Sequence, residues 1–431
     1  MATTGAQQAA ADDTSPNGLI AYSAWDDAGN YDIYVVDPAQ PDVPPVKLTT
    51  DGRYNSNPDW SPDGTKIAFD GWSDVSGPRI QVMDADPATP DQTVLTVPCV
   101  DSFDCYGDFQ PEWSPDGTRI AFVSSRPNAD GSPNWSYELY VMDATGEVGA
   151  QPPATRLTTD PLPEFGQGIN DSQVTWSPDG TRLAFVSQGR SDVRDTCDLW
   201  TMDSQDADGD GFGDNLERIT FDDSYNCDAF EDTTPEWSPD SSVIAFTSTR
   251  SGYFDIWLVN ADDPTDLRNV TQTPGEYEDQ PSWSPDGTQI IFRSSKSGAY
   301  EYYSLPVPPP GGETAGGLIA AEPTQLTFDG QPKRQGDWGT VAKSRPGTAV
   351  LSVDKRGAGT VTSAPAKIHC GKVCAATFVA KTKVHLAAHA KPGWQFKRWT
   401  GACRGSHRAC DVRMGVDRKV GAKFVRSAVV S

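Results

Sequence analysis

Residues 110–122 read QPEWSPDGTRIAF, and the 431-residue chain contains four related copies of this phrase. The copies lie at residues 57–69, 173–185, 234–246 and 280–292, and the tryptophans of the five phrases are residues 60, 113, 176, 237 and 283. Repeats of roughly 40–50 residues, lengthened here by insertions, are typical of a β-propeller whose blades each contain four short strands.

The phrase itself predicts a turn between two strands. Ser61-Pro62-Asp63-Gly64 fits a type I turn, because Ser suits the first position, Pro presets φ at the second and Gly suits the fourth. Trp60 would end the strand before the turn, and residues 66–69 alternate as the beginning of the next strand. We expect the repeated tryptophans to pack between blades, because a large aromatic side chain at a fixed blade position is usually core.

Two further strands follow the phrase in every unit, as in residues 138–143 (ELYVMD) and 156–159 (RLTT). The chain enters the repeat at residues 19–22, a second-strand sequence, and leaves it through residues 337–341, a Trp strand with no turn after it. The last strand would therefore complete the first blade and remove the free sheet edges. The sequence predicts an all-β fold with a closed six-bladed propeller over residues 18–342.

The repeated P-x-W-S-P-D-G-x-x-I-A-F phrase resembles that of TolB-type β-propellers. The resemblance implies a propeller that binds peptides or proteins. Similar propellers also precede the hydrolase domain of prolyl-oligopeptidase-type peptidases and form some polysaccharide lyases, so the fold leaves the function open.

The charges divide the chain into two parts. The net charge of −25 is the sum of about −40 over residues 1–342 and +15 over residues 343–431. A chain this acidic is not expected to bind nucleic acid, and no apolar stretch is long enough for a membrane span. After a linker at residues 343–347, residues 348–431 read as short strands.

The C-terminal part contains G-x-G-x-V-x-S, C-G-x-x-C and G-x-x-F-x-x-W in this order. This order resembles the divergent internalin-type B repeat, a small β-module of bacterial surface proteins. Its basic charge is compatible with docking on an anionic cell-wall polymer or lipid, with packing against the acidic propeller, or with a merely soluble surface.

Eight cysteines fall into four local pairs, and their spacings do not give the two CxxC arms of a zinc site. We expect disulfides, which form in oxidising compartments. Residues 1–17 are small and polar, without signal-peptide features, and we expect them to be disordered. An extracellular, periplasmic or cell-surface location follows if a signal has been removed. The expected pairs are Cys99–Cys105, Cys197–Cys227, Cys370–Cys374 and Cys403–Cys410.

Residues 206–217 (DADGDGFGDNLE) fit a twelve-residue calcium loop. Alternate carboxylates turn toward a hard cation, and Gly at the sixth position allows the sharp bend. A solvated acidic loop is the alternative. The predicted calcium ligands are Asp206, Asp208, Asp210, the backbone oxygen of Phe212, Asp214 and Glu217.

A second acidic pattern lies five residues before each tryptophan. If the innermost strand of each blade begins near the central channel, these residues would form a ring at one channel mouth and bind a cation or a basic ligand. Alternatively, each caps its own local turn. The ring would contain Asn55, Asp108, Asp171, Asp232 and Glu278, followed by Lys333 at the closing strand.

All four histidines lie after residue 368, and no G-x-S-x-G motif occurs. A Ser-His-Asp triad or a histidine-bound metal centre therefore cannot form within the propeller. We expect a monomeric binding or scaffold protein that recognises a peptide, protein or glycan. The alternative is a glycan-active lyase or glycosidase that uses carboxylates.

Overall fold

The computed structural model divides the chain into two compact units, Asn17–Val341 and a second unit that contains Ala342–Ser431. Each unit is described by itself. The structure describes residues 17–41, 43–73, 77–85, 92–96, 106–127, 134, 136–144, 154–159, 169–190, 196–205, 213–221, 232–307, 322–339, 348–364, 368–370, 374–379, 383–414 and 418–426.

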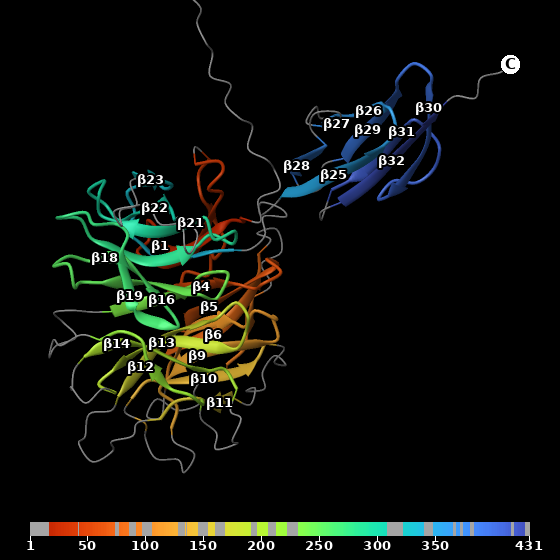
Figure 1. Cartoon of the computed structure of the whole chain (residues 1–431). Helices are drawn as coiled ribbons and strands as arrows, with labels where there is room; N and C mark the ends of the chain where they lie inside the picture. Colours follow the sequence, from red (N-terminus) through yellow and green to blue (C-terminus); the bar gives the residue numbers. More distant parts are fainter. Residues whose placement is uncertain are drawn as a thin grey trace, which may run out of the picture. The chain divides into compact units, whose positions relative to one another are not determined.

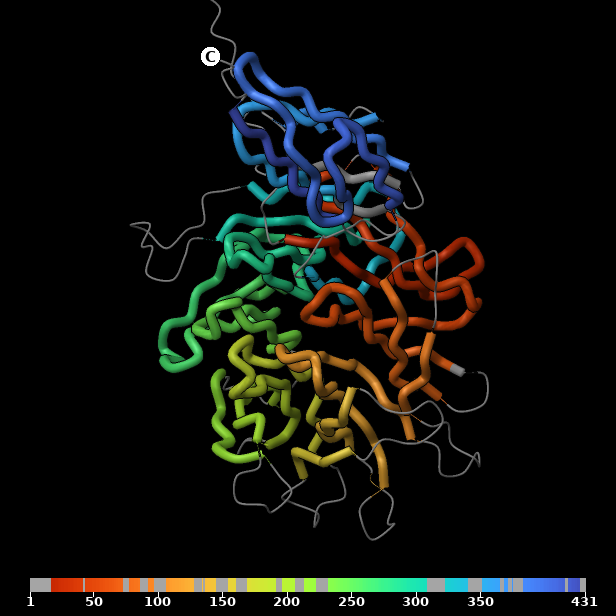
Figure 2. Tube along the Cα trace, turned by 90° about the vertical axis from the view of Figure 1, so that its right-hand side faces the viewer, coloured from red at the N-terminus to blue at the C-terminus, as the bar shows by residue number. Residues whose placement is uncertain are grey.

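Six four-stranded antiparallel sheets build the first unit, and they follow one another in chain order (Figures 1 and 2). The described residues contain strands and no helix, which confirms the all-β prediction. The sheets are β24(Lys333–Trp338)-β1(Ile20–Trp25)-β2(Tyr31–Val36)-β3(Val46–Lys47), β4(Asn55–Trp60)-β5(Lys66–Ser73)-β6(Gly77–Asp84)-β7(Thr93–Val94), β8(Asp108–Trp113)-β9(Arg119–Ser124)-β10(Glu138–Asp143)-β11(Ala154–Arg156), β12(Asn170–Trp176)-β13(Arg182–Gln188)-β14(Cys197–Asp203)-β15(Glu217–Arg218), β16(Asp232–Trp237)-β17(Val243–Ser248)-β18(Asp255–Asn260)-β19(Asp263–Asn269) and β20(Glu278–Trp283)-β21(Gln289–Ser294)-β22(Glu301–Pro306)-β23(Thr324–Gln325).

The last strand of the unit belongs to the first sheet. β24 pairs with β1 in antiparallel register from Ile20↔Trp338 to Ala24↔Lys333. The backbone N–H of Gly18 also donates to the carbonyl of Gly339 (3.0 Å). Strands β4, β8, β12, β16, β20 and β24 are in contact one after another, and β24 is also in contact with β4.

The Ser-Pro-Asp-Gly turns are held by a hydrogen-bond pattern that explains their composition. At residues 61–66, the N–H of Gly64 donates to the carbonyl of Ser61 (2.8 Å), as in a type I turn. The Ser61 hydroxyl donates to Asp63 (2.8 Å), and the same carboxylate accepts from the N–H of Thr65 (2.9 Å). Hydrogen bonds within residues 61–66 therefore stabilise the turn of the β4–β5 hairpin.

The repeated tryptophans pack between neighbouring sheets, as predicted. Trp60 on β4 lies in one cluster with Ile33 and Val35 of β2, and Trp113 on β8 lies in one cluster with Ile80 and Val82 of β6. All six tryptophans at this position, including Trp338, are at most 8% exposed. Each tryptophan therefore buries its apolar surface against the preceding sheet.

The second unit contains two four-stranded sheets. One sheet has the order β28(Ala375–Val379)-β25(Thr348–Arg356)-β32(Arg418–Arg426)-β30(Trp394–Gly401), with β25 parallel to β32. The other has the order β27(His369–Cys370)-β26(Gly359–Ala364)-β29(Lys383–Ala390)-β31(Ala409–Arg413). Apolar side chains from both sheets, among them Leu351, Val384, Trp399 and Phe424, form one core cluster.

Candidate functional site

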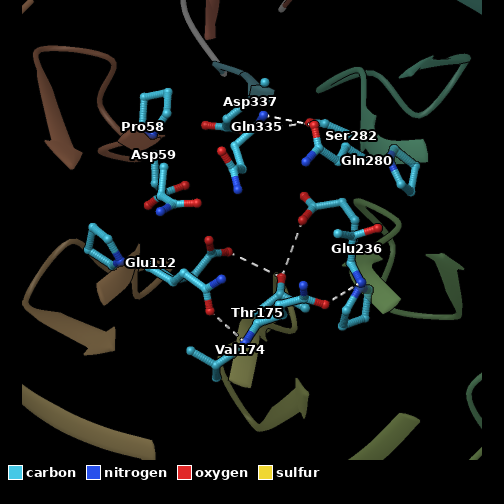
Figure 3. A pocket seen from close by; sticks show the side chains of 18 residues that line it. Pro58, Asp59, Glu112, Val174, Thr175, Glu236, Gln280, Ser282, Gln335 and Asp337 are labelled. Carbon is cyan, nitrogen blue, oxygen red and sulfur yellow. Dashed lines mark hydrogen bonds between the residues drawn. The ribbon is translucent and has the colours of Figure 1, made fainter. Parts of the chain in front are cut away.

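The central feature of the first unit is a cavity of about 120 Å³, open to solvent, at the axis around which the sheets are arranged (Figure 3). Each sheet contributes three consecutive residues from the strand that ends in the repeated tryptophan. The lining residues are Asn57-Pro58-Asp59, Gln110-Pro111-Glu112, Gln173-Val174-Thr175, Thr234-Pro235-Glu236, Gln280-Pro281-Ser282 and Gln335-Gly336-Asp337.

A repeated β-bulge positions these residues. The first residue of every triplet has a left-handed backbone, with φ between 34° and 56°, although none of the six is glycine. The strand register shifts at the same place, for example between Ser56 and Asp59 on β4. A bulge re-aims side chains and bends the strand, and a left-handed non-glycine residue carries backbone strain that is often found at functional sites.

The amide side chains of the bulges join one strand to the next. The N–H of Gln173 donates to Oε1 of Gln110 (3.0 Å), the N–H of Thr234 donates to Oε1 of Gln173 (2.7 Å), and the N–H of Gln335 donates to Oε1 of Gln280 (2.8 Å). These bonds satisfy backbone donors that the bulge removes from the ladder. The strained backbone is thus stabilised by the neighbouring sheet.

Four carboxylic acids face the cavity, namely Asp59, Glu112, Glu236 and Asp337. The carboxylates of Asp59 and Asp337 accept from backbone N–H groups, those of Trp113 (2.6 Å) and Trp60 (2.9 Å) respectively. The eighteen lining residues include no Lys, Arg or His. The cavity is therefore lined by one sign of charge.

Burial and mutual repulsion keep protons on this set. Burial, followed by the charge of Asp337, raises the pKa of Glu112 to about 8. Burial, followed by the charges of Glu112 and Asp337, raises the pKa of both Asp59 and Glu236 well above the usual range. Burial also raises the pKa of Asp337. A crowded set of this kind titrates as a group, so the protonation of each carboxyl group depends on the charge of the others.

A single hydroxyl connects two of the acids. The Oγ1 atom of Thr175 lies 3.1 Å from Oε1 of Glu112 and 3.4 Å from Oε2 of Glu236 (Figure 3). A hydroxyl has one proton to donate, so a proton on one of the carboxyl groups would satisfy the second contact. This geometry agrees with the raised pKa values.

The residues predicted to form a ring at the channel mouth are not among those that line this cavity. All six are 0% exposed. Three are paired with arginines that follow the second strand of their own sheet: Asp108 with Arg126 (two contacts of 3.2 Å), Asp171 with Arg190 and Asp232 with Arg250.

The other members of the predicted ring have different surroundings. Asn55 donates to Asp51 (2.9 Å), and Lys333 is paired with Glu301 (2.8 Å) and with Asp329. Burial raises the pKa of Glu278. Ligand binding by Asn55, Asp108, Asp171, Asp232 and Glu278 stays a prediction.

The residues that do line the cavity carried a signal in the sequence. An acid stands directly before Trp60, Trp113, Trp237 and Trp338. The alternation of an ordinary strand does not distinguish that position, because only the bulge decides which side chains face the axis. The arginine partners also left a signal, since Arg126 and Arg250 both stand two residues after a serine that ends the second strand.

Most of the predicted calcium loop lies outside the described residues, namely Asp206, Asp208, Asp210 and Phe212. The backbone oxygen of Asp214 accepts from the N–H of Asp203 (2.8 Å), and Glu217 begins β15 opposite Thr201. Among the described residues, no group of three or more His, Cys, Asp or Glu is placed to hold a metal ion. Calcium binding is taken up below as a proposal.

Two of the predicted disulfides are present, Cys370–Cys374 and Cys403–Cys410. Cys197 is also disulfide-bonded. Its predicted partner Cys227 lies outside the described residues, as do Cys99 and Cys105. The C-terminal module is therefore cross-linked, as its cysteine spacing predicted.

Comparison with known proteins identifies the C-terminal module. Residues 350–428 match the family of divergent InlB B-repeat domains. The propeller resembles in fold the crystal structure of TolB from Acinetobacter baumannii, with a TM-score of 0.53 and 22% sequence identity over 75% of this chain and 66% of that chain. This second likeness shows a TolB-like propeller fold, which was predicted from the Trp-Ser-Pro-Asp-Gly repeats.

Two curated bacterial proteins match parts of the sequence. The uncharacterized peptidase YuxL of Bacillus subtilis is 29% identical over 140 residues, 32% of this chain and 16% of that protein. An uncharacterized protein of Agrobacterium fabrum is 26% identical over 223 residues, 51% of this chain and 59% of that protein. The chain thus spans less than two thirds of the length of both relatives.

In the described part of the chain, no helix is long and apolar enough to cross a membrane.

Proposed function

We propose that this chain is a secreted or cell-surface binding and scaffold protein whose six sheets are the blades of a closed propeller. In this proposal, the axial cavity binds a basic group of a peptide or protein. One observation carries the proposal: the cavity is lined by four carboxylic acids and by no basic side chain. The pairing of β24 with β1 supports the closed ring.

The chemistry favours a cationic ligand over a neutral glycan. A Lys or Arg side chain in the cavity would pair with carboxylates that otherwise repel each other, and the low local dielectric would strengthen the attraction. The entering cation would lower the pKa values of Glu112 and its neighbours, so protons would leave as the ligand binds. Binding should therefore become tighter as the pH rises toward 8.

The remaining parts of the protein would serve attachment and stability. Disulfides in the C-terminal module are typical of proteins in oxidising compartments. We infer that this module attaches the propeller to a surface.

We also infer that residues 206–217 bind one structural calcium ion, supported by their ligand spacing. Calorimetric titration of the protein with Ca²⁺ tests this second inference, because D208A/D210A should abolish the binding heat.

A lysine-rich octapeptide tests the channel proposal. Calorimetry at pH 8 should detect binding to the wild-type protein, and E112Q/E236Q should bind the peptide at least about ten-fold more weakly, because each lost charge contact contributes on the order of 1 kcal/mol. Binding to the wild-type protein should also weaken at pH 5, where the carboxylic acids hold their protons.

The control removes two acidic charges far from the axis. Asp262 and Glu322 are exposed acids whose side chains are 80% and 92% accessible. The D262N/E322Q variant should bind the peptide as the wild type does. An equal loss in this control, or no loss in E112Q/E236Q, would refute the channel proposal. Wild-type cleavage of a polysaccharide or peptide that disappears in E112Q would instead favour the alternative of a carboxylate-based enzyme.

A further inference from the structure

One sheet of the C-terminal module carries three cations in a row across adjacent strands. Arg398 on β30 is the register partner of Lys423 on β32, and Lys423 is the register partner of Arg356 on β25. The flanking residues Trp399 and Ala422 are buried, whereas all three cations are exposed, so the row lies on the outer face of the sheet. Neighbouring strands are about 4.8 Å apart, so the row spans roughly 10 Å.

This row costs stability in the isolated protein. Like charges directly opposite each other on neighbouring strands are destabilising. The acid nearest in register, Asp354, reaches only Arg356, at 3.7 Å and with both side chains more than half exposed. Within the described residues, neither Arg398 nor Lys423 has an ion-pair partner. An anion that lies along the row would remove the repulsion.

The second sheet of the module provides an internal contrast. Lys383 and Arg413 are also direct register partners. There, however, Asp411 bonds both the Lys383 ammonium (2.8 Å) and the His385 ring (2.7 Å). The repulsion on this sheet is thus compensated within the protein, whereas among the described residues the row on β30, β32 and β25 has only the exposed Asp354–Arg356 pair.

The surroundings of the row favour a polymer over a membrane. Two residues along each strand, Thr400, Gly421 and Asp354 form the neighbouring row on the same outer face. Gly421 adds no side chain to this row. Among the module residues whose side chains the structure describes, which leave out residues 348–350 and 375–379, no large hydrophobic side chain is exposed. Peripheral membrane binding usually combines cations with apolar side chains that enter the lipid, and the described side chains of this face include no exposed large apolar group.

We propose that the row of Arg356, Lys423 and Arg398 binds a linear polyanionic polymer of the phosphodiester type, such as the poly(glycerol phosphate) of a bacterial cell wall. The inference rests on the proposed attachment role of the module and names the face and the ligand class for it. The polymer would run along the row and place successive phosphates beside the three cations. The contacts are charge-assisted hydrogen bonds, which guanidinium groups form in a bidentate manner.

Binding of the full chain to poly(glycerol phosphate) tests this inference. The R356Q/K423Q/R398Q variant should lose about a hundred-fold in affinity, because each cation near an anionic surface contributes on the order of five-fold. The matched control K383Q/R408Q/R413Q removes three exposed cations from the other part of the module and should bind nearly as the wild type does. The polymer should also raise the Tm of the wild type and not that of the row variant.

Three results would overturn the inference. An equal loss in both triple variants would mean that only net charge matters. Equal or tighter binding to phosphatidylglycerol vesicles would assign the face to a membrane. No polymer binding by the wild type would remove the ligand class. The lysine-rich peptide serves as an independent control, because its binding in the channel would persist if only this inference fails.

Discussion

The two units of this protein each crowd charges of one sign, but in opposite environments. In the propeller, Glu112, Glu236 and two aspartates share a half-buried cavity. In the module, Arg356, Lys423 and Arg398 share an exposed sheet face. Inside the channel, the protein relieves the repulsion by holding protons, as the raised pKa of Glu112 indicates. On the sheet face, guanidinium groups cannot lose their protons near neutral pH, so solvent, salt or a ligand must supply the compensation.

The difference shows how burial determines the way in which a protein tolerates like charges. In a low dielectric, ionisation of neighbouring acids costs more than keeping a proton, so the site becomes sensitive to pH. At an exposed surface, the same crowding costs a few tenths of a kcal/mol and makes the site sensitive to salt. The channel should therefore respond to pH and the sheet face to ionic strength.

The largest change in stability should follow the loss of a buried acid that is paired with an arginine. Asp171 is 0% exposed and is paired with Arg190, whose side chain is 8% exposed. The D171A substitution would leave the guanidinium buried without its carboxylate and should lower the free energy of unfolding by about 3–5 kcal/mol. Urea denaturation at pH 7 measures this loss.

The channel supplies the control for this prediction. In D59N, the amide oxygen can still accept from the N–H of Trp113, and no cation loses a partner. This variant should lose far less stability than D171A. Equal losses in the two variants would show that paired and crowded acids do not differ as the structure indicates.

The intermediate effect concerns the pH response of the channel. Because the pKa of Glu112 is raised to about 8, the folded protein binds more protons than the unfolded chain between about pH 4.5 and pH 8. Stability from this group is complete below the unfolded pKa and decreases as the pH rises through 8. The E112Q substitution should thus have little effect at pH 4 and should stabilise the protein at pH 9, on the order of 1 kcal/mol after allowance for solvent in the channel.

Urea denaturation of E112Q and the wild type at both pH values measures this difference. The turn acid Asp116 gives a control of opposite sign, because its hydrogen bonds lower its pKa to about 2, with that of the Ser114 hydroxyl first among them. The D116N variant should therefore lose stability at pH 9. A destabilised E112Q at pH 9 would contradict the assigned channel repulsion.

The smallest effect should appear on the sheet face. The K423Q substitution removes the middle cation of the row and should raise the Tm of the module by about 1–3 °C at low salt, since like-charge pairs on a sheet cost a few tenths of a kcal/mol. The shift should disappear in 1 M NaCl, where the Debye length is about 3 Å. Thermal unfolding followed by circular dichroism measures both values. K419Q is the matched control, because the register partner of Lys419 is the uncharged Ser352, and an equal shift in K419Q would contradict the proposed repulsion.

Much of the fold could be read from local residues. Ser61-Pro62-Asp63-Gly64 makes its own turn, so the hairpins and their spacing were predictable. The strand at residues 333–338 could be assigned to the first sheet because it has a Trp but no following turn. The disulfides of the module were predictable because their cysteines are close in sequence.

The candidate site was less accessible to such reasoning. Asp108 and Asp171 were expected at the channel mouth, and this stays a prediction; both are buried beside Arg126 and Arg190, and neither lines the cavity. The cavity is lined instead by residues two to four positions further along each strand, such as Glu112. The reason is the bulge at Gln110 and its equivalents, whose left-handed backbone redirects the side chains that follow.

Four features of this protein follow from its residues alone: the repeated turns, the number of strand segments, the division of charge between the two units and the cysteine pairs of the module. These features depend on residues that are close along the chain, so their chemistry acts locally. Which acids face the channel and which cations form a row depends instead on the folded chain. Those relations depend on bulges and on cross-strand register, and a shift of a single residue in register moves every side chain of a strand to the opposite face.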